Sequence, residues 1–577
     1  MPGCRRWRFE DLISELQGSV YRNVAGYDAK YFPHSFPPGT IQGASSSSSS
    51  IPLQSPLDLL KWLDDFQYQQ LSTAQNKFVL RSIRDNHTSI SDSTLCLVRN
   101  SASKLDGPCP DTAVLVLGLF QAEIASSQVD EAVLSLCDAA MRIFAARPDR
   151  QFLHAFRLYN STMETWTFDR AGAYSGKAFN IVQEPHRFRN MVATYMLMDD
   201  NRLGLNPVLR QEDQGVFLEL EEPNQPWSTR LSVDEDAFVK QDYLVGPGTT
   251  CFKARIPGLS DHGLVVKFAW EQSEVSAEPR FLRFANERHV WGLPKLEGHQ
   301  NLGDIARLRR GLQFDQPYGF SLPRLDAEDT DVPAKQASSG LAEHDKGAKF
   351  DNLRFECVVT SPLGRPLDTF SSPAELMVVL HDIVRALRSL HLQANILHRD
   401  VSPQNIIIAT RNRQDPDAPA GMLIDLDLAL DLANPPSERR LVGSRGFMAI
   451  GILGGDHRTY RHDLESLFYV FLWMAICHDG ATSHHVPDKS RLHAWRGTDF
   501  LAVFHKKKED MQPTEFSKWA EDEFTPPFRP YLPLAATVHQ LLFPIRNGKI
   551  FIGTDPEPDA RERLYAGMMT AFERNVS

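Results

Sequence analysis

Two aspartates and an asparagine in the second half of the chain have the residue types and spacing that phosphoryl transfer requires. Asp400 and Asn405 lie in the run ILHRDVSPQNIII at residues 396–408. The carboxylate of Asp400 can accept the proton of an incoming hydroxyl, and the amide oxygen of Asn405 is a ligand that magnesium prefers. Asp425 ends the apolar segment GMLID at residues 421–425, where its carboxylate can bind magnesium that bridges nucleotide phosphates.

The order of these residues narrows the chemistry. His398-Arg399-Asp400 followed by Asn405 has the H-R-D-x-x-x-x-N spacing of a kinase catalytic loop, and Asp425 follows where kinases carry the aspartate of D-F-G. Either motif alone could be a surface loop or an ordinary aspartate at a strand end. The two motifs in order, each beside an apolar segment, favour a magnesium-dependent kinase that uses ATP.

A kinase also needs a cation for the nucleotide phosphates, and Lys267 is the candidate. It lies in the segment LVVKF at residues 264–268, which resembles the V-A-I-K strand. A lysine at a strand end is by itself usually a solvated residue, so this assignment depends on the motifs downstream. Its expected ion-pair partner on the following helix is Glu278, with Glu274 and Glu287 as alternatives.

Two glycines precede the lysine, in the segment LVGPGTT at residues 244–250. Gly246 and Gly248 would let the backbone approach phosphates in a strand-turn-strand setting, so they are predicted to help bind the nucleotide. Pro247 and the missing third glycine depart from the usual glycine-rich loop, and the segment alone would be an ordinary turn.

Composition divides the chain into three parts. Residues 1–57 are predicted to form an amino-terminal segment with a flexible linker, because a serine tract at residues 45–50 lies beside prolines and glycines. Residues 58–225 are predicted to form a mixed α/β domain that could regulate the rest. Residues 226–577 form the expected catalytic domain, with a flexible insertion at about residues 326–351 that is rich in charge and lacks an apolar period.

Apolar spacing predicts the main elements of these parts. In the first domain we expect helices over residues 59–78 and 129–146, a buried strand over 114–120, and a hairpin of 152–158 with 163–168. In the catalytic domain, a long helix over residues 375–392 is expected to lead into the catalytic loop.

Charge and cysteine usage exclude several classes of protein. The net charge of -11 and the pI near 6.0 disfavour nucleic acid as the main partner, since surfaces that bind it concentrate Lys and Arg. The seven cysteines are scattered without a CxxC pair, which fits a reducing compartment. The longest apolar run, residues 467–477, is too short for a membrane span. We therefore expect an intracellular protein of the cytoplasm or nucleus, with no membrane partner.

With these residues in place, the sequence resembles the fungal-type protein kinase family, a branch of the protein kinase fold. The resemblance is carried by ILHRDVSPQNIII, LIDLDLAL, GSRGFMAI at residues 443–450 and HDLESLFYVFLW at 462–473, and it extends to RFECVVTSPLGRPL at 354–367 and to WTFDRAG at 166–172. It implies an α+β fold in which a mixed α/β domain precedes a bilobal catalytic domain, with a β-rich first lobe and a helical second lobe. It also implies ATP and Mg²⁺ as cofactors and a Ser or Thr of a protein substrate as acceptor.

The resemblance assigns roles to further residues. Ser444 falls where Ser/Thr kinases carry the threonine of the P+1 loop, and Asp463 matches the aspartate that braces the catalytic loop. Arg399 matches the arginine that can pair with a phosphate on the activation segment, for which Ser437 is a candidate site.

Three positions depart from the usual kinase pattern. Ser402 stands where Ser/Thr kinases place a lysine that contacts the γ-phosphate, a change that is common in the fungal family. Asp427 replaces the glycine of D-F-G and limits backbone freedom there. Gly451 replaces the glutamate of A-P-E, which in typical kinases anchors the activation segment through a buried arginine pair. Breaking one partner of such a pair can cost about 3 to 5 kcal/mol.

These departures leave alternatives open. A pseudokinase or scaffold that binds ATP without efficient transfer would share the fold, although all four main candidate residues are retained. A small-molecule phosphotransferase of the aminoglycoside or choline kinase type would share the strand end at residues 424–427, whereas Arg399 and the segment at 443–450 favour a protein acceptor. Nuclease activity in the first domain is disfavoured because Leu119-Phe120-Gln121 lacks an acidic-x-lysine pair.

Overall fold

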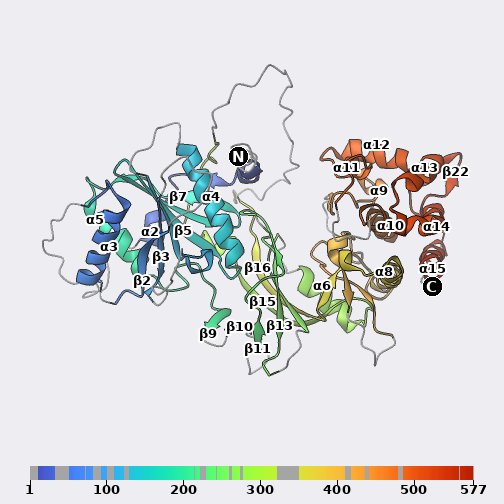
Figure 1. Ribbon diagram of the computed structural model, residues 1–577, viewed down its shortest axis with the longest axis horizontal. Coiled ribbons are helices and arrows are strands. Elements are labelled where there is room, and N and C mark those ends of the chain that lie inside the picture. The colour runs from blue at the N-terminus through green and yellow to red at the C-terminus, as the bar shows by residue number, and fades with distance from the viewer. Residues whose placement is uncertain are drawn as a thin grey trace, which may run out of the picture.

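The computed structural model describes residues 11–32, 51–71, 73–81, 93–100, 109–121, 129–212, 215–220, 229–241, 243–258, 263–272, 277–320, 350–409, 417–435, 441–478, 485–557 and 559–575. Two large sheets and a group of helices follow one another along the chain, as the colours from blue to red show in Figure 1. The predicted mixture of α and β structure is therefore confirmed. In the described part of the chain, no helix has the length and apolar character that crossing a membrane demands.

The first sheet has eight strands in the order β1-β7-β6-β5-β4-β3-β2, with β8 paired to β6. Its strands are β1 (Val20–Tyr21), β2 (Asn76–Arg81), β3 (Ser93–Arg99), β4 (Val116–Gln121), β5 (Phe152–Tyr159), β6 (Thr162–Asp169), β7 (Gly172–Ser175) and β8 (Phe179–Asn180). Alternate residues of these strands belong to two separate cores, because successive side chains point to opposite faces. Helix α4 (Val129–Ala146) packs on one face, and α2 (Tyr27–Tyr31), α3 (Pro56–Gln70) and α5 (Pro185–Leu197) pack on the other.

The predicted hairpin and the helix over residues 129–146 are confirmed. Strands β5 and β6 pair antiparallel from Phe152 with Asp169 to Tyr159 with Thr162. The two residues between them, Asn160 and Ser161, have φ angles of 45° and 62°. Positive φ at both positions is typical of a type I′ turn, which is one of the two common connections of a two-residue hairpin.

The predicted helix over residues 59–78 is wrong in its second half. Helix α3 ends at Gln70, and Phe78 lies in β2. The buried Asn76 fixes this strand by donating hydrogen bonds to the carbonyl oxygens of Met196 and Met198, at 3.3 and 3.0 Å. A contact to residues so distant in sequence leaves no local period that could have indicated it.

The second sheet has the order β15-β16-β14-β13-β11-β10-β9, with β12 paired to β13, and every pair is antiparallel. Its strands are β9 (Leu209–Glu212), β10 (Gly215–Leu220), β11 (Thr229–Val233), β12 (Val239–Lys240), β13 (Thr250–Arg255), β14 (Leu264–Glu271), β15 (Lys295–Asp304) and β16 (Arg354–Ser361). Helix α6 (Ala277–Glu287) follows β14.

The helical region begins with α8 (Pro373–Ala394), which contains the helix predicted over residues 375–392. Ser372 caps its start by accepting a hydrogen bond from the Glu375 backbone, and Asn395 ends it in the left-handed conformation. Later in the chain come α9 (Ile450–Leu453), α10 (Tyr460–Cys477), α11 (Leu492–Trp495), α12 (Phe500–Asp510), α13 (Pro513–Glu523), α14 (Leu532–Leu542) and α15 (Ala560–Glu573). Short strands β17 (Gly364–Pro366), β18 (Ile396–Leu397), β19 (Ile406–Ala409), β20 (Gly421–Leu423) and β21 (Leu430–Asp431) lie before α9 in the chain.

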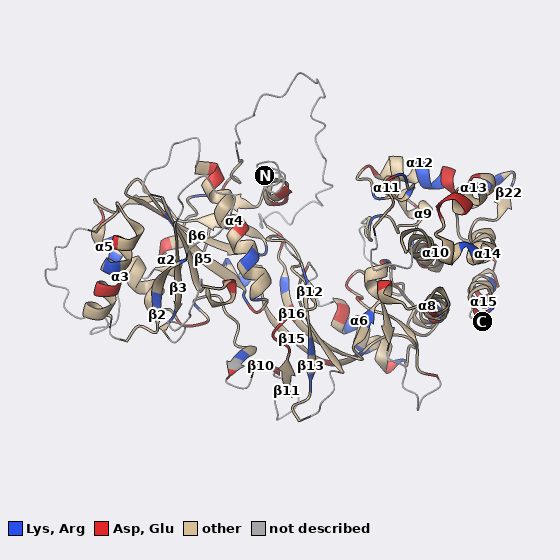
Figure 2. Cartoon of the chain, in the orientation of Figure 1, with Lys and Arg blue, Asp and Glu red and all other residues tan. Residues whose placement is uncertain are grey.

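Element membership differs from the predicted boundaries at two places. β1 and α2, which precede residue 58, belong to the first sheet and its core. β9 and β10, which precede residue 226, belong to the second sheet. Most of the predicted insertion and the serine tract lie outside the described residues. Figure 2 shows Lys and Arg interspersed with Asp and Glu over the sheets and helices of the described chain.

Candidate functional site

The catalytic-loop motif lies between β18 and β19, and a side chain of α10 binds its backbone. Asp463 accepts hydrogen bonds from the backbone N–H groups of His398, at 2.8 Å, and Arg399, at 3.0 Å. Arg399 has a φ of 71°, a conformation that side chains other than glycine rarely adopt. The buried carboxylate of Asp463 therefore stabilises a strained turn directly before Asp400.

Asp400 is held at both carboxylate oxygens. Its Oδ1 accepts a hydrogen bond from the Ser444 backbone N–H at 2.6 Å, and its Oδ2 accepts one from Nδ2 of Asn405 at 3.0 Å. The same Asn405 nitrogen donates to the Asp400 carbonyl oxygen at 2.9 Å. Because the amide nitrogen makes both bonds, the amide oxygen is the Asn405 atom that can serve a cation.

The aspartate segment after β20 is joined to this loop through its backbone. His398 accepts a hydrogen bond from the Asp400 N–H on Nδ1 and donates one from Nε2 to the Ile424 carbonyl, at 3.3 and 3.1 Å. The Ile424 N–H donates in turn to the Asn405 carbonyl at 3.0 Å. Asp425, the next residue, has a φ of 68°. These bonds fix the place of Asp425 relative to Asp400 and Asn405.

Lys267, near the middle of β14, lies against three carboxylates. Its Nζ donates to Glu278 at 2.8 Å and to Asp425 and Asp427 at 3.0 Å each. Only 13% of its side chain is exposed, and 5% of that of Glu278. Of the two alternatives to Glu278, Glu287 is exposed at the far end of α6, and Glu274 lies outside the described residues.

The electrostatics of this cluster follow from burial and from its unequal charges. Burial opposes the charge of Lys267, but the three carboxylates outweigh it and raise the lysine pKa well above its ordinary value. Burial and the charge of Asp425 raise the pKa of Asp427, whereas the lysine holds the pKa of Asp425 below its ordinary value against the effect of burial. Of the two aspartates, Asp425 is therefore the one whose ionised form is favoured beside Lys267.

The glycines of the predicted phosphate-binding turn contact the first sheet. The N–H of Gly246 donates to the carbonyl oxygen of Arg170 at 2.9 Å. A Cβ at Gly248 would lie 2.3 Å from the guanidinium carbon of Arg170, so a larger residue would displace that side chain. This contact gives both glycines a packing role, and nucleotide binding by the turn stays a prediction.

The activation segment is anchored by residues that the motifs did not predict. The buried Glu465 of α10 accepts a hydrogen bond from the Ile450 N–H at 2.7 Å and pairs with Arg461 at 2.5 Å. The buried Lys507 of α12 donates to the carbonyl oxygens of Gly446 and Met448, at 2.7 and 2.8 Å. Together these two buried side chains fix the backbone of residues 446–450.

The surroundings of residue 451 explain why glycine is suited to this position. A Cβ on it would lie 2.7 Å from Oδ2 of Asp456 and 2.8 Å from Nε2 of the buried His462. The cost expected from the missing A-P-E glutamate stays a prediction. Close to this segment, the described structure contains a buried ion pair between Glu465 and Arg461.

Two further side chains lie in or beside the catalytic loop, those of Ser402 and Arg458. Ser402 is buried, and its hydroxyl has no hydrogen-bond partner among the described residues. Arg458 donates to the Arg399 carbonyl at 2.9 Å and also to the carbonyl of Val442, which ties the activation segment to the catalytic loop. Ser437 lies outside the described residues.

Lys507 could have been suspected from spacing. Val503 and Met511 lie four residues to either side of it and are both buried, so Lys507 occupies the inward face of α12. Its place within Lys506-Lys507-Lys508, however, is typical of a solvated helix face.

Comparison with known families agrees with the motifs and the geometry. The model of the family described as fungal protein kinase matches residues 93–475, which is more than half of the chain. The matched span starts at β3 of the first sheet and ends within α10, so it includes Lys267, Asp400, Asn405 and Asp425. The resemblance inferred from the sequence is thereby confirmed, and the chain belongs to the fungal protein kinase family.

Proposed function

We propose that the chain is an active kinase that transfers the γ-phosphate of ATP to Ser or Thr hydroxyls of protein substrates, with Mg²⁺ as cofactor. The observation that carries this proposal is the contact of Lys267 with both Glu278 and Asp425, because it joins a phosphate-binding cation to a metal-binding carboxylate. The second sheet with α6 would form the first lobe of the catalytic domain, and the helical region would form the second.

The side chains fit ATP and magnesium. Lys267 is a buried cation whose charge is assured by its neighbours, and Asn405 and Asp425 offer the oxygen atoms that a hard cation requires. Magnesium held by Asn405 and Asp425 would neutralise charge that develops on the phosphates during transfer. Lys267 would hold the α and β phosphates, and Glu278 would hold Lys267 in place.

Asp400 is the proposed catalytic base. Both of its oxygens accept hydrogen bonds, from Ser444 and Asn405, so the carboxylate has a fixed orientation. A fixed carboxylate can orient the substrate hydroxyl and take its proton as the oxygen attacks phosphorus. The hydrogen bond from Ser444 also places the activation segment beside the base. This position supports the proposal that the phosphate acceptor is a residue of a protein substrate.

The anchored activation segment favours a protein substrate over a small alcohol. Lys507 and Glu465 hold residues 446–450 in one conformation, and such a fixed segment suits docking of a polypeptide. A pseudokinase is the second candidate, and one observation favours it: Asp427 adds a further carboxylate to Lys267, which competes with phosphate for the amine.

Transfer of labelled phosphate from ATP to casein, in the presence of Mg²⁺, tests the proposal on the full chain. We expect Asp400→Asn to lower the rate at least about 100-fold, the usual contribution of a general base, while ATP binding is kept. Asp488→Asn, at an exposed aspartate, is the matched control and should keep full activity. Full activity in Asp400→Asn, or phosphate found on small alcohols but never on Ser or Thr, would overturn the proposal.

A further inference from the structure

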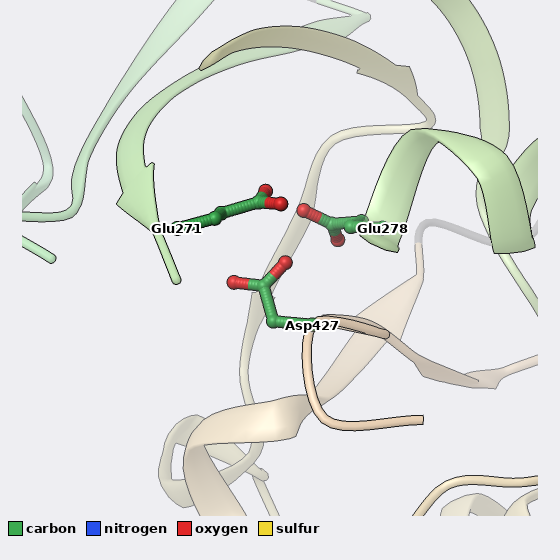
Figure 3. Close-up of side chains that lie close together, drawn as sticks. All are labelled: Glu271, Glu278 and Asp427. Carbon is green, nitrogen blue, oxygen red and sulfur yellow. The ribbon is translucent and has the colours of Figure 1, made fainter. Parts of the chain in front are cut away.

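Three carboxylates from separate segments converge beside Lys267 and form what we call the acidic cluster: Glu271, Glu278 and Asp427. Glu271 ends β14, Glu278 lies in the first turn of α6, and Asp427 follows β20. One oxygen atom of each lies within 4.8 Å of one oxygen of each of the others. Figure 3 shows the carboxylates of Glu271 and Glu278 facing each other, with that of Asp427 turned toward them.

Two oxygens of the acidic cluster are buried without a hydrogen-bond partner among the described residues. Glu271 is 7% exposed, and its Oε2 accepts a bond from the Ala277 N–H at 3.1 Å, whereas its Oε1 has no partner. Asp427 gives its Oδ2 to Lys267, whereas its Oδ1 has none. Buried carboxylate oxygens without a donor are costly, so a cation that binds these two atoms would be stabilising.

The charges around Lys267 are also unequal. The lysine brings one positive charge to Glu278, Asp425 and Asp427, and Glu271 places a fourth carboxylate beside them. Like charges this close cannot all stay ionised without a further counter-charge.

We propose that the acidic cluster binds one divalent cation, Mg²⁺ or Mn²⁺, without the help of a nucleotide. Hard cations take carboxylate oxygens as ligands, and the three residues supply one each while water completes the shell. This ion is distinct from the one expected at Asn405 and Asp425, and it goes beyond the proposed function because it requires no ATP. It links β14, α6 and the segment after Asp425, so it would hold the Lys267–Glu278 pair assembled before nucleotide binds.

Mn²⁺ titration of the nucleotide-free full chain at pH 8, followed by the loss of the free-ion electron paramagnetic resonance signal, tests this site. We expect one bound ion, with affinity lowered at least tenfold by Glu271→Gln and by Asp427→Asn. Glu271→Gln keeps an acceptor for the Ala277 N–H and removes the charge. Glu287→Gln, at an exposed glutamate of the same helix as Glu278, is the matched control and should leave the affinity unchanged.

Asn405→Ala separates this site from the one that serves ATP, and it should keep the nucleotide-free Mn²⁺. The proposal is overturned if no ion binds at millimolar Mn²⁺, which would mean that protons alone neutralise the cluster. It is also overturned if binding disappears in Asn405→Ala but persists in Glu271→Gln. Circular dichroism checks folding, and Asp427→Asn carries the test if Glu271→Gln does not fold. Because no phosphoryl transfer is measured, an inactive kinase would not affect the result.

Discussion

Lys267 donates a hydrogen bond to Asp427 at 3.0 Å, although the position of Asp427 is that of the glycine in D-F-G. The replacement therefore does more than restrict the backbone, since it adds a carboxylate to a lysine that already contacts Glu278 and Asp425. The amine is the shared counter-charge of the buried Glu278 and of Asp425 and Asp427, which are partly exposed. Its removal should affect folding as well as nucleotide binding.

We predict that Lys267→Met lowers the free energy of unfolding by about 3 to 5 kcal/mol at pH 8, the usual loss when one partner of a buried ion pair is removed. The loss should be smaller at pH 6, because Glu271, whose pKa burial raises to about 7, takes up a proton between pH 8 and pH 6 and relieves the repulsion. Urea unfolding of the full chain at the two pH values measures both quantities.

Lys267→Arg is the matched control, because it keeps the positive charge and should lose much less stability than Lys267→Met at pH 8. An equal loss in both variants at both pH values would show that packing of the lysine stem, and not its charge, supports the fold. Because Lys267→Met is expected to destabilise the fold, Asp400→Asn is the better variant for testing catalysis.

The sequence could indicate which candidate catalytic residues lie together, because their relations are local. Asp400 and Asn405 belong to one loop, so their spacing alone brings them to hydrogen-bond distance. Asp425 follows a short strand, β20, that pairs with β19 directly after the loop. The hairpin of β5 and β6 was predictable for the same reason, since its turn residues are adjacent.

Residues that act through distant contacts could not be predicted in this way. Lys507 reaches the activation segment across a long stretch of sequence, as its bonds to Gly446 and Met448 span 61 and 59 positions. Glu271 reads as an ordinary charged residue at a strand end, and only the folded chain places it opposite Asp427. Tertiary packing determines the contacts of both residues, and the local spacing of apolar residues does not indicate such contacts.

Gly451 leads to a prediction about the absent A-P-E glutamate. We expect Gly451→Glu to lower stability by about 1 to 3 kcal/mol, the usual result of overpacking, because its Cβ would collide with Asp456 and His462. Asp456 is exposed and can move, whereas His462 is buried and accepts a hydrogen bond from the Thr459 N–H at 3.0 Å. The melting temperature measures the effect. A gain in stability or in kinase activity would contradict this account. It would show that a glutamate at this position stabilises the segment and that its absence weakens it.

Lys507 should be essential for the conformation of the activation segment. Lys507→Met keeps the apolar stem but leaves the carbonyl oxygens of Gly446 and Met448 without their donor, and an unsatisfied buried acceptor costs about 1 to 3 kcal/mol. We expect lower stability and a lower rate of transfer to protein, with ATP affinity unchanged, because Lys267 and Asp425 lie elsewhere. Lys508→Met, one position along the same helix, should change none of these. Unchanged transfer in Lys507→Met would mean that the segment does not need this anchor.

The same lysine should make stability depend on pH in a defined window. Burial lowers the pKa of Lys507 from its ordinary value of 10.5 to about 7, against the opposing charge of Glu465. Between these values the unfolded chain holds a proton that the folded chain has released, so the free energy of unfolding rises with pH. Below pH 7 both states are protonated and the contribution is constant.

We therefore expect the difference in unfolding free energy between wild type and Lys507→Met to grow from pH 7 to 9.5 and to stay level from pH 5.5 to 6.5, in urea titrations. The ring of Tyr469 opposes the effect of burial on the Lys507 pKa. Its centre lies 3.8 Å from Nζ of Lys507, and an aromatic face stabilises a charged amine. A level difference up to pH 9.5 would mean that this ring and Glu465 keep Lys507 charged, and that it anchors the segment as an ammonium ion.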